Sequence, residues 1–137
     1  MKNCIAAILL FVPALLLAQT KPVKIVFDVT SKDTLTHQAV LRHVTGMAKA
    51  YPDAMLEVVI YGGAWPMVVN GKSSSDDVIE SLAANKNVSF KICSITMERF
   101  NVENTDLVAG VEVVPDGIIE IVTKQNEGWG YIKESHN

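Results

Sequence analysis

The chain has 137 residues, 49% of them hydrophobic, and its 12 basic and 15 acidic residues give a net charge of −3. This length suits one domain with a real hydrophobic core and is too short for two ordinary domains. The sequence has no basic cluster of the kind that phosphate binding needs, so composition argues against a nucleic-acid partner.

Residues 1–18 have the features of a secretory signal peptide. One positive charge, Lys2, precedes an apolar run over residues 5–17, and a small residue, Ala18, ends the segment. The run is shorter than the roughly 20 apolar residues of a membrane-spanning helix. We therefore expect cleavage near Ala18 and export to the periplasm without a membrane anchor. The mature chain, 19–137, is then a single domain with a net charge of −4.

The first half of the mature chain predicts a strand, a helix and a second strand. Residues 23–29 and 55–62 are short apolar runs rich in β-branched side chains, which is typical of buried strands. Between them, apolar residues recur at helical spacing after the N-cap candidates Asp33 and Thr34, and Pro52 ends the pattern. Two strands joined by a helix are expected to pair in parallel.

The same alternation continues to the C-terminus. Residues 73–87 predict a second helix, and a later helix that opens after Pro115 has Ile118, Ile121 and Val122 on one side. The other expected elements are a strand at 88–92, a short helix after Cys93, a strand at 111–114 and a strand at 129–133. We therefore predict an α/β three-layer sandwich, with a mostly parallel sheet of about five strands between helices.

In a parallel sheet, the loops that follow the strands meet at one edge, where functional residues concentrate. Several residues of the sequence are expected at this edge: the loop after Val29, Gly63 and Trp65 in "GGAWP", Cys93, and Pro115 and Asp116. Trp65 can line a pocket there or contact a second subunit.

Two histidines lie on the first expected helix. His37 and His43 are six residues apart and do not share a helix face, so we predict no metal site, and no motif indicates a cofactor. His37 is in the first turn, near the expected edge, where it is a candidate to assist a thiol. An exposed histidine without a role is the alternative.

Cys93 is the one cysteine that remains after removal of residues 1–18, so the mature chain can form no internal disulfide. Its place at the start of a helix favours the nucleophilic thiolate. Its place at the end of an apolar strand favours burial as a small hydrophobic residue. Position alone leaves both alternatives open.

Two stretches carry a resemblance to a known family: "FKICSITMERFNV" and "VEVVPDGIIEIVTKQNEGWGYIK". An apolar strand ending in cysteine, a Thr-Met pair, a "VP-small-G-hydrophobic-E" helix start and a "G-W/Y-x-Y-I" ending are typical of the DsrE/DsrF-like family of sulfur-relay proteins. The chain resembles that family in Cys93, Thr96 and Met97, in 114–120, in Gln125 and in 128–132.

The resemblance implies a compact α/β fold, a homo-oligomer (trimer or hexamer), and a cysteine at position 93 that carries sulfane sulfur as a persulfide. Backbone N–H groups at Ser94 and Ile95 would then stabilise its negative charge, with Thr96 also lining the site. The sulfur donor and acceptor are unidentified. The predicted export signal departs from the pattern of the family, because its sulfur-relay members work in the cytoplasm.

Two other functions are compatible with the same residues. The first is a non-catalytic oligomeric binding module, in which Cys93 is buried at a subunit contact. The second is a thiol redox sensor, in which Cys93 becomes a sulfenic acid or a mixed disulfide without a sulfur donor.

Overall fold

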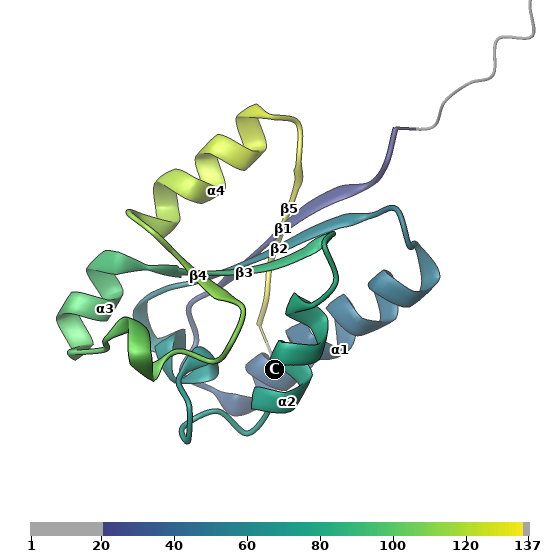
Figure 1. The fold of residues 1–137 in the computed structure, drawn as a ribbon. Coiled ribbons are helices and arrows are strands. Elements are labelled where there is room, and N and C mark those ends of the chain that lie inside the picture. The colour runs from purple at the N-terminus through teal and green to yellow at the C-terminus, as the bar shows by residue number, and fades with distance from the viewer. Residues whose placement is uncertain (1–20, 136–137) are drawn as a thin grey trace, which may run out of the picture.

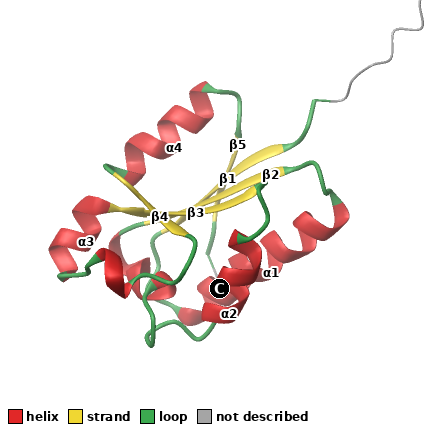
Figure 2. Ribbon diagram, in the orientation of Figure 1, coloured by secondary structure: helices red, strands yellow, loops and turns green. Residues whose placement is uncertain are grey.

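The computed structural model describes residues 21–135, which form one sheet with helices on both sides (Figures 1 and 2). The strands are β1 (Lys24–Val29), β2 (Met55–Ile60), β3 (Val88–Cys93), β4 (Val111–Val114) and β5 (Gly130–Lys133). Their order across the sheet is β4-β3-β2-β1-β5, and every strand pair is parallel. The predicted α/β sandwich with five strands is therefore confirmed. The predicted signal peptide, 1–18, lies outside the described residues.

The helices form the two outer layers. They are α1 (Thr34–Ala50), α2 (Asp76–Ala83), α3 (Ser94–Phe100) and α4 (Gly117–Asn126), with short 3-10 helices η1 (Gly62–Val68) and η2 (Asn104–Asp106). Helix α4 lies across β1, β2 and β3 on one face, whereas α1 and α2 cover the other (Figure 1). Helix α3 extends from the end of β3 at the carboxyl edge of the sheet. Within residues 21–135, no helix has the length and apolar character to cross a membrane.

Local sequence explains where these elements begin and end. The Asp33 side chain accepts a hydrogen bond from the Leu35 N–H and caps α1, as the sequence predicted. Asp116 caps α4 in the same way, accepting from the N–H groups of Ile118 and Ile119. The "GGAWP" segment, expected as a loop, is instead the start of η1. Met67, further along η1, is buried in the core.

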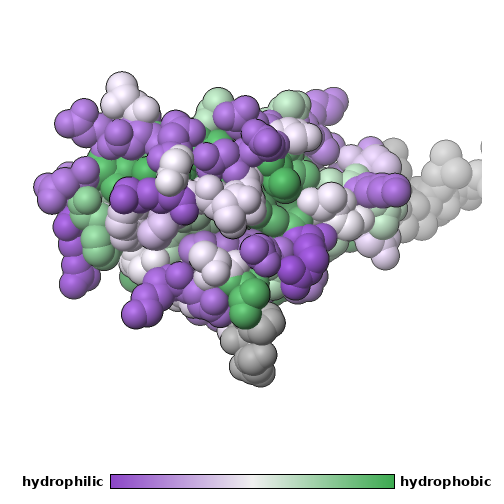
Figure 3. All heavy atoms as spheres, turned by 90° about the horizontal axis from the view of Figure 1, so that it is seen from below, coloured by the Kyte–Doolittle hydropathy of each residue, from purple (hydrophilic) through white to green (hydrophobic). Residues whose placement is uncertain are grey.

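The two faces of the sheet have unequal cores. The larger core lies under α1 and α2 and includes the fully buried Phe27, Leu56 and Phe90. The smaller core, under α4, is built around Val26, Val59, Ile121 and Trp129. The surface that carries α1 and α2 is dominated by hydrophilic residues with separate apolar patches between them (Figure 3).

Helix α4 buries less of its apolar side than its spacing suggests. Ile121 is buried, whereas Ile118 and Val122 are exposed, as is Ile119. A single helix on this face has neighbours only beneath it, so its flanking side chains stay in contact with solvent.

Candidate functional site

Cys93 ends β3 and is the residue that precedes α3. It is buried, with 5% of its surface exposed. Gly117, the first residue of α4, lies directly over it. A β-carbon at position 117 would be 3.3 Å from Cys93 Cβ, from Tyr61 Cδ1 and from Val59 Cγ1. The absence of a side chain at Gly117 thus lets α4 start against the thiol.

Hydrogen bonds from the residues after Cys93 hold the segments around it. The Ser94 hydroxyl donates to the Pro115 carbonyl oxygen at 2.9 Å, which joins α3 to the turn before α4. The Thr96 hydroxyl oxygen accepts from the Gly62 N–H at 3.0 Å, which joins α3 to η1. Thr96 is buried and Ile95 is exposed. The structure therefore places Ser94 and Thr96, just after Cys93, in contact with the Pro115–Asp116 turn and with η1, respectively.

The structure does not bring His37 to the thiol. His37 is buried rather than exposed, and its Nε2 donates to the Ser31 carbonyl oxygen at 2.7 Å. It lies on α1, on the opposite side of the sheet from α4, which covers Cys93. The expectation that His37 is exposed is therefore wrong, because the loop after β1 packs on its ring, and its described hydrogen bond goes to that loop and not to Cys93.

Gly63 and Trp65 are engaged elsewhere in the protomer. A β-carbon at Gly63 would lie 3.1 Å from the Thr30 carbonyl oxygen, so η1 packs closely on the loop after β1. Trp65 is half-buried and stacks on Phe100 with ring centroids 5.4 Å apart. This stacking joins η1 to α3, and none of the contacts described for the Trp65 ring is with Cys93.

A second group of side chains lies beside Cys93 at the same edge, and of its members the sequence placed only Thr30 there, in the loop after Val29. We call it the Asp28 cluster: Asp28, Thr30, Tyr61, Tyr131 and Lys133. Asp28 is buried, with 5% exposed, and accepts from the Tyr131 hydroxyl at 2.6 Å and from Lys133 Nζ at 3.0 Å. Lys133 Nζ also donates to the Thr30 hydroxyl oxygen at 2.6 Å and lies 5.8 Å from the centre of the Tyr61 ring.

Both phenol groups of the Asp28 cluster are protonated at neutral pH. Burial, followed by the nearby Asp28 carboxylate, raises the pKa of Tyr61 to about 12. The hydrogen bond to Asp28 is the main cause that raises the pKa of Tyr131 to about 12. The cluster therefore presents neutral hydroxyl donors and one ammonium group around a buried carboxylate.

A third polar group lies between α4 and the middle of the sheet. Glu57, on β2, is 2% exposed and accepts from the Ser89 hydroxyl at 3.2 Å, and Lys124 Nζ lies 3.4 Å from the same carboxylate oxygen. Burial, then the neighbouring Glu120 carboxyl group, raises the pKa of Glu57 to about 7, although Lys124 opposes the shift.

The sequence contained a signal for both missed groups. Asp28 and Glu57 interrupt the strands "KIVFDV" and "MLEVVI", which are otherwise almost wholly apolar at their centres. A carboxylate in a buried strand requires a partner, so it marks a polar cluster. The partners themselves, on β5 and α4, are far along the chain and carry no comparable signal.

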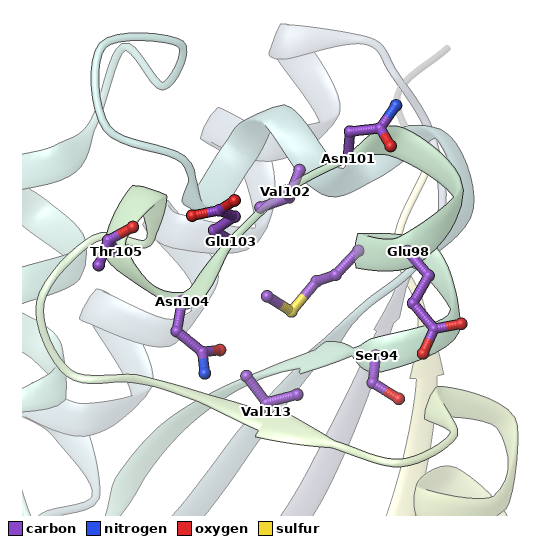
Figure 4. Close-up of a pocket in the computed structure, with 9 residues that line it drawn as sticks. Ser94, Glu98, Asn101, Val102, Glu103, Asn104, Thr105 and Val113 are labelled. Carbon is purple, nitrogen blue, oxygen red and sulfur yellow. The ribbon is translucent and has the colours of Figure 1, made fainter.

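An open groove of about 790 Å³ adjoins the site on the side of α3. Figure 4 shows Ser94 and Val113 on one side of it and Glu103, Asn104 and Thr105 across from them. Ser94, which follows Cys93 in the chain, is among the lining residues, whereas Cys93 is not. The groove is therefore next to the thiol site without being its pocket.

Comparison with known proteins shows which family and which solved structures this chain resembles. A family model, that of the DsrE/DsrF-like family, matches residues 24–133. The solved structure of MTH1491 from Methanobacterium thermoautotrophicum, a protein of unknown function, is 27% identical with a TM-score of 0.75. The alignment covers 81% of this chain and 98% of MTH1491. Curated proteins give no significant match.

Two further solved structures share the fold at lower identity. The ychN protein of E. coli is 14% identical with a TM-score of 0.66, covering 82% of this chain and 97% of ychN. BT1422 of Bacteroides thetaiotaomicron, a conserved protein of unknown function, is 15% identical with a TM-score of 0.65. The alignment covers 80% of this chain and 93% of BT1422. Because the family match extends from β1 to the end of β5 and includes Cys93, the protein belongs to the DsrE/DsrF-like family.

Proposed function

We propose that the protein is a sulfur carrier in which Cys93 holds sulfane sulfur as a persulfide. Membership of the DsrE/DsrF-like family suggests a function related to sulfur relay. The observation that carries the proposal is the place of Cys93: it ends β3 at the carboxyl edge of a parallel sheet, where ligands bind in such folds. The family resemblance assigns the persulfide to this same position.

The proposed chemistry is an exchange of one sulfur atom between thiols. The Cys93 thiolate attacks the outer sulfur of a donor persulfide, the donor S–S bond breaks, and the donor thiolate leaves with its electron pair. Cys93 is then a persulfide. An acceptor thiolate attacks the outer sulfur in turn, and the Cys93 thiolate is released. No net oxidation occurs, and no second cysteine of this chain is needed.

The burial of Cys93 favours a second candidate, a non-catalytic oligomeric binding module with a packed cysteine. In that case a thiol reagent reaches Cys93 only on unfolding. A carrier instead requires the thiol to react in the folded protein, through the edge where Ser94 and Tyr61 are half-buried.

Intact mass spectrometry after exposure of the folded protein to polysulfide distinguishes these functions. A sulfur carrier gains the mass of one or more sulfur atoms, loses it on reduction, and shows no gain in Cys93→Ser or after prior thiol blocking. A protein that stays unmodified, and whose Cys93 resists alkylation until it unfolds, is the binding module. A gain of oxygen with peroxide, but none of sulfur with polysulfide, indicates a redox sensor.

Two further features belong to the proposal. The sulfur-relay resemblance supports a homo-oligomer (trimer or hexamer), and the exposed apolar side of α4 is a surface that such an assembly can bury. Residues 1–18 support export to the periplasm, so donor and acceptor would be periplasmic molecules.

A further inference from the structure

The carboxyl edge of the sheet aligns Cys93 with the Asp28 cluster. Val29, Ile60 and Ile92 are paired across β1, β2 and β3. The residues that follow them, Thr30, Tyr61 and Cys93, therefore stand in a row across the edge. Adjacent strands are about 4.8 Å apart, so Cys93 on β3 and Thr30 after β1 are separated by roughly 10 Å. Tyr61 lies between them: a β-carbon at Gly117 would meet both its ring and Cys93, and Lys133 Nζ lies 5.8 Å from the centre of its ring.

Lys133 supplies a fixed positive charge at the far end of this row. Asp28 and Thr30 accept two of the three hydrogen atoms that an ammonium group can donate, which leaves one for a ligand. The Asp28 carboxylate is buried, whereas 44% of the Lys133 side chain is exposed. The ammonium group is thus held by Asp28 and Thr30, on a side chain that is partly exposed to solvent.

We propose that Lys133 binds the anionic end of an elongated sulfur donor, a hydropolysulfide, while the protonated end of that donor reaches Cys93; this rests on the proposed sulfur-carrier function. Sulfur–sulfur bonds are about 2 Å long, so the four bonds of a chain of roughly five sulfur atoms measure at most about 8 Å, and its contacts with Cys93 and Lys133 make up the rest of the row. The Tyr61 ring forms an apolar wall along it.

The reaction balances with the donor as the one co-reactant. The Cys93 thiolate attacks the protonated terminal sulfur, an S–S bond forms, and the donor S–S bond to that sulfur breaks. Cys93 becomes a neutral persulfide, and the shortened polysulfide leaves as a dianion with the electron pair of the broken bond. Lys133 pairs with the charge at the far end of this leaving group and so reduces the repulsion between the two negative ends of the dianion. Asp28 is then a positioning residue that orients the ammonium group.

The test compares the rate at which Cys93 is modified by an anionic and a neutral reagent. The variant Lys133→Met removes the charge, and Lys133→Arg keeps it. Lys24→Met is the matched control, because Lys24 lies on the same sheet, four residues before Asp28 and roughly 13 Å from it along β1. That distance exceeds the screening length of about 8 Å at physiological salt. Inorganic polysulfide is the anionic reagent, and an uncharged organic trisulfide is the neutral one.

We expect Lys133→Met to slow persulfide formation from polysulfide by roughly tenfold or more, with Lys133→Arg and Lys24→Met near wild type. The neutral trisulfide should react with all four proteins at similar rates. Equal slowing with both reagents would show that Lys133 only stabilises β5, and it would overturn this inference while leaving the sulfur carrier intact. The trisulfide converts Cys93 to a mixed disulfide or trisulfide, so only polysulfide reports on the persulfide itself, and its absence from wild type treated with polysulfide would overturn the carrier function.

The wild-type protein provides a second measurement if Lys133→Met fails to fold. Added salt should slow the reaction with polysulfide and leave the reaction with the trisulfide unchanged. A polysulfide rate that does not depend on salt contradicts a role for the ammonium charge.

Discussion

At the scale of single residues, Gly117 determines how closely α4 approaches the thiol. A β-carbon there would contact Cys93, Tyr61 and Val59 at 3.3 Å each, which is tight for all three. The two methyl groups of valine would have to displace at least one of these neighbours. We therefore expect Gly117→Val to lower the free energy of unfolding by roughly 1–3 kcal/mol, as overpacked sites do.

Chemical denaturation measures this effect, with Gly46→Val as the matched control. Gly46 is within α1, and a β-carbon there would meet nothing within 4 Å. Valine at position 46 is therefore expected to change stability by less than about 0.5 kcal/mol. If the two variants had equal stability, α4 would not be packed on Cys93 as the structure shows.

At the scale of elements, a buried polar contact joins α4 to the sheet. Glu57 of β2 faces Glu120 and Lys124 of α4. On the same side of the sheet, Ser89 of β3 donates a hydrogen bond to Glu57. Lys91 of β3 also lies on this side and pairs with Glu112 of β4. Two carboxyl groups that share one buried site disfavour a second negative charge. This contact is therefore expected to be stronger when Glu57 is protonated.

The raised pKa of Glu57 predicts how stability depends on pH. In the unfolded chain Glu57 releases its proton near its ordinary pKa of 4.5, whereas in the folded protein it does so at about 7. Between these values the folded state holds more protons, so stability decreases as pH rises. The stabilisation from protonated Glu57, at most about 3 kcal/mol, is complete below pH 4.5 and lost above about pH 7.

Urea denaturation of the wild type and of Glu57→Gln at pH 5 and pH 8 tests this prediction. Glutamine does not titrate, so the variant should lose less stability than the wild type between the two pH values. An identical pH dependence in the two proteins would mean that Glu57 has an ordinary pKa in the fold.

At the scale of the whole molecule, the exposed apolar side of α4 predicts an interface between copies of the chain. Ile118 and Ile119 are 57% and 60% exposed, and Val122 is 45% exposed. A glutamate at the centre of such an interface leaves an unpaired charge without water. If the proposed trimer or hexamer forms through this side of α4, Ile119→Glu weakens self-association by roughly 2 kcal/mol or more and shifts the protein towards monomer.

Sedimentation velocity measures the oligomeric state, and Leu35→Glu is the control. Leu35 is a comparably exposed apolar residue on α1, away from α4, so its substitution should leave the assembly unchanged. A wild-type protein that sediments as a monomer at all accessible concentrations would refute the proposed assembly.

The sequence predicted the order of the elements and the parallel sheet, because hydrophobic periodicity and capping residues act within a few positions. For the same reason it predicted that Cys93, Ser94, Thr96 and the Pro115–Asp116 turn share one edge. The exposure of His37 was predicted wrongly, since the burial of a side chain depends on the loop that packs on it.

The place of β5 beside β1 was decided only by the tertiary structure. This pairing brings Lys133 and Tyr131 to Asp28, residues more than 100 positions apart in the chain. The local hydrophobic pattern predicts where each strand lies in the sequence. It does not predict which strands pair, because pairing depends on how the connecting helices cross the sheet. The sequence by itself therefore determined the fold class and the position of the thiol. The packing of distant segments decided that Gly117 covers the thiol and that Lys133 lies across the same edge of the sheet.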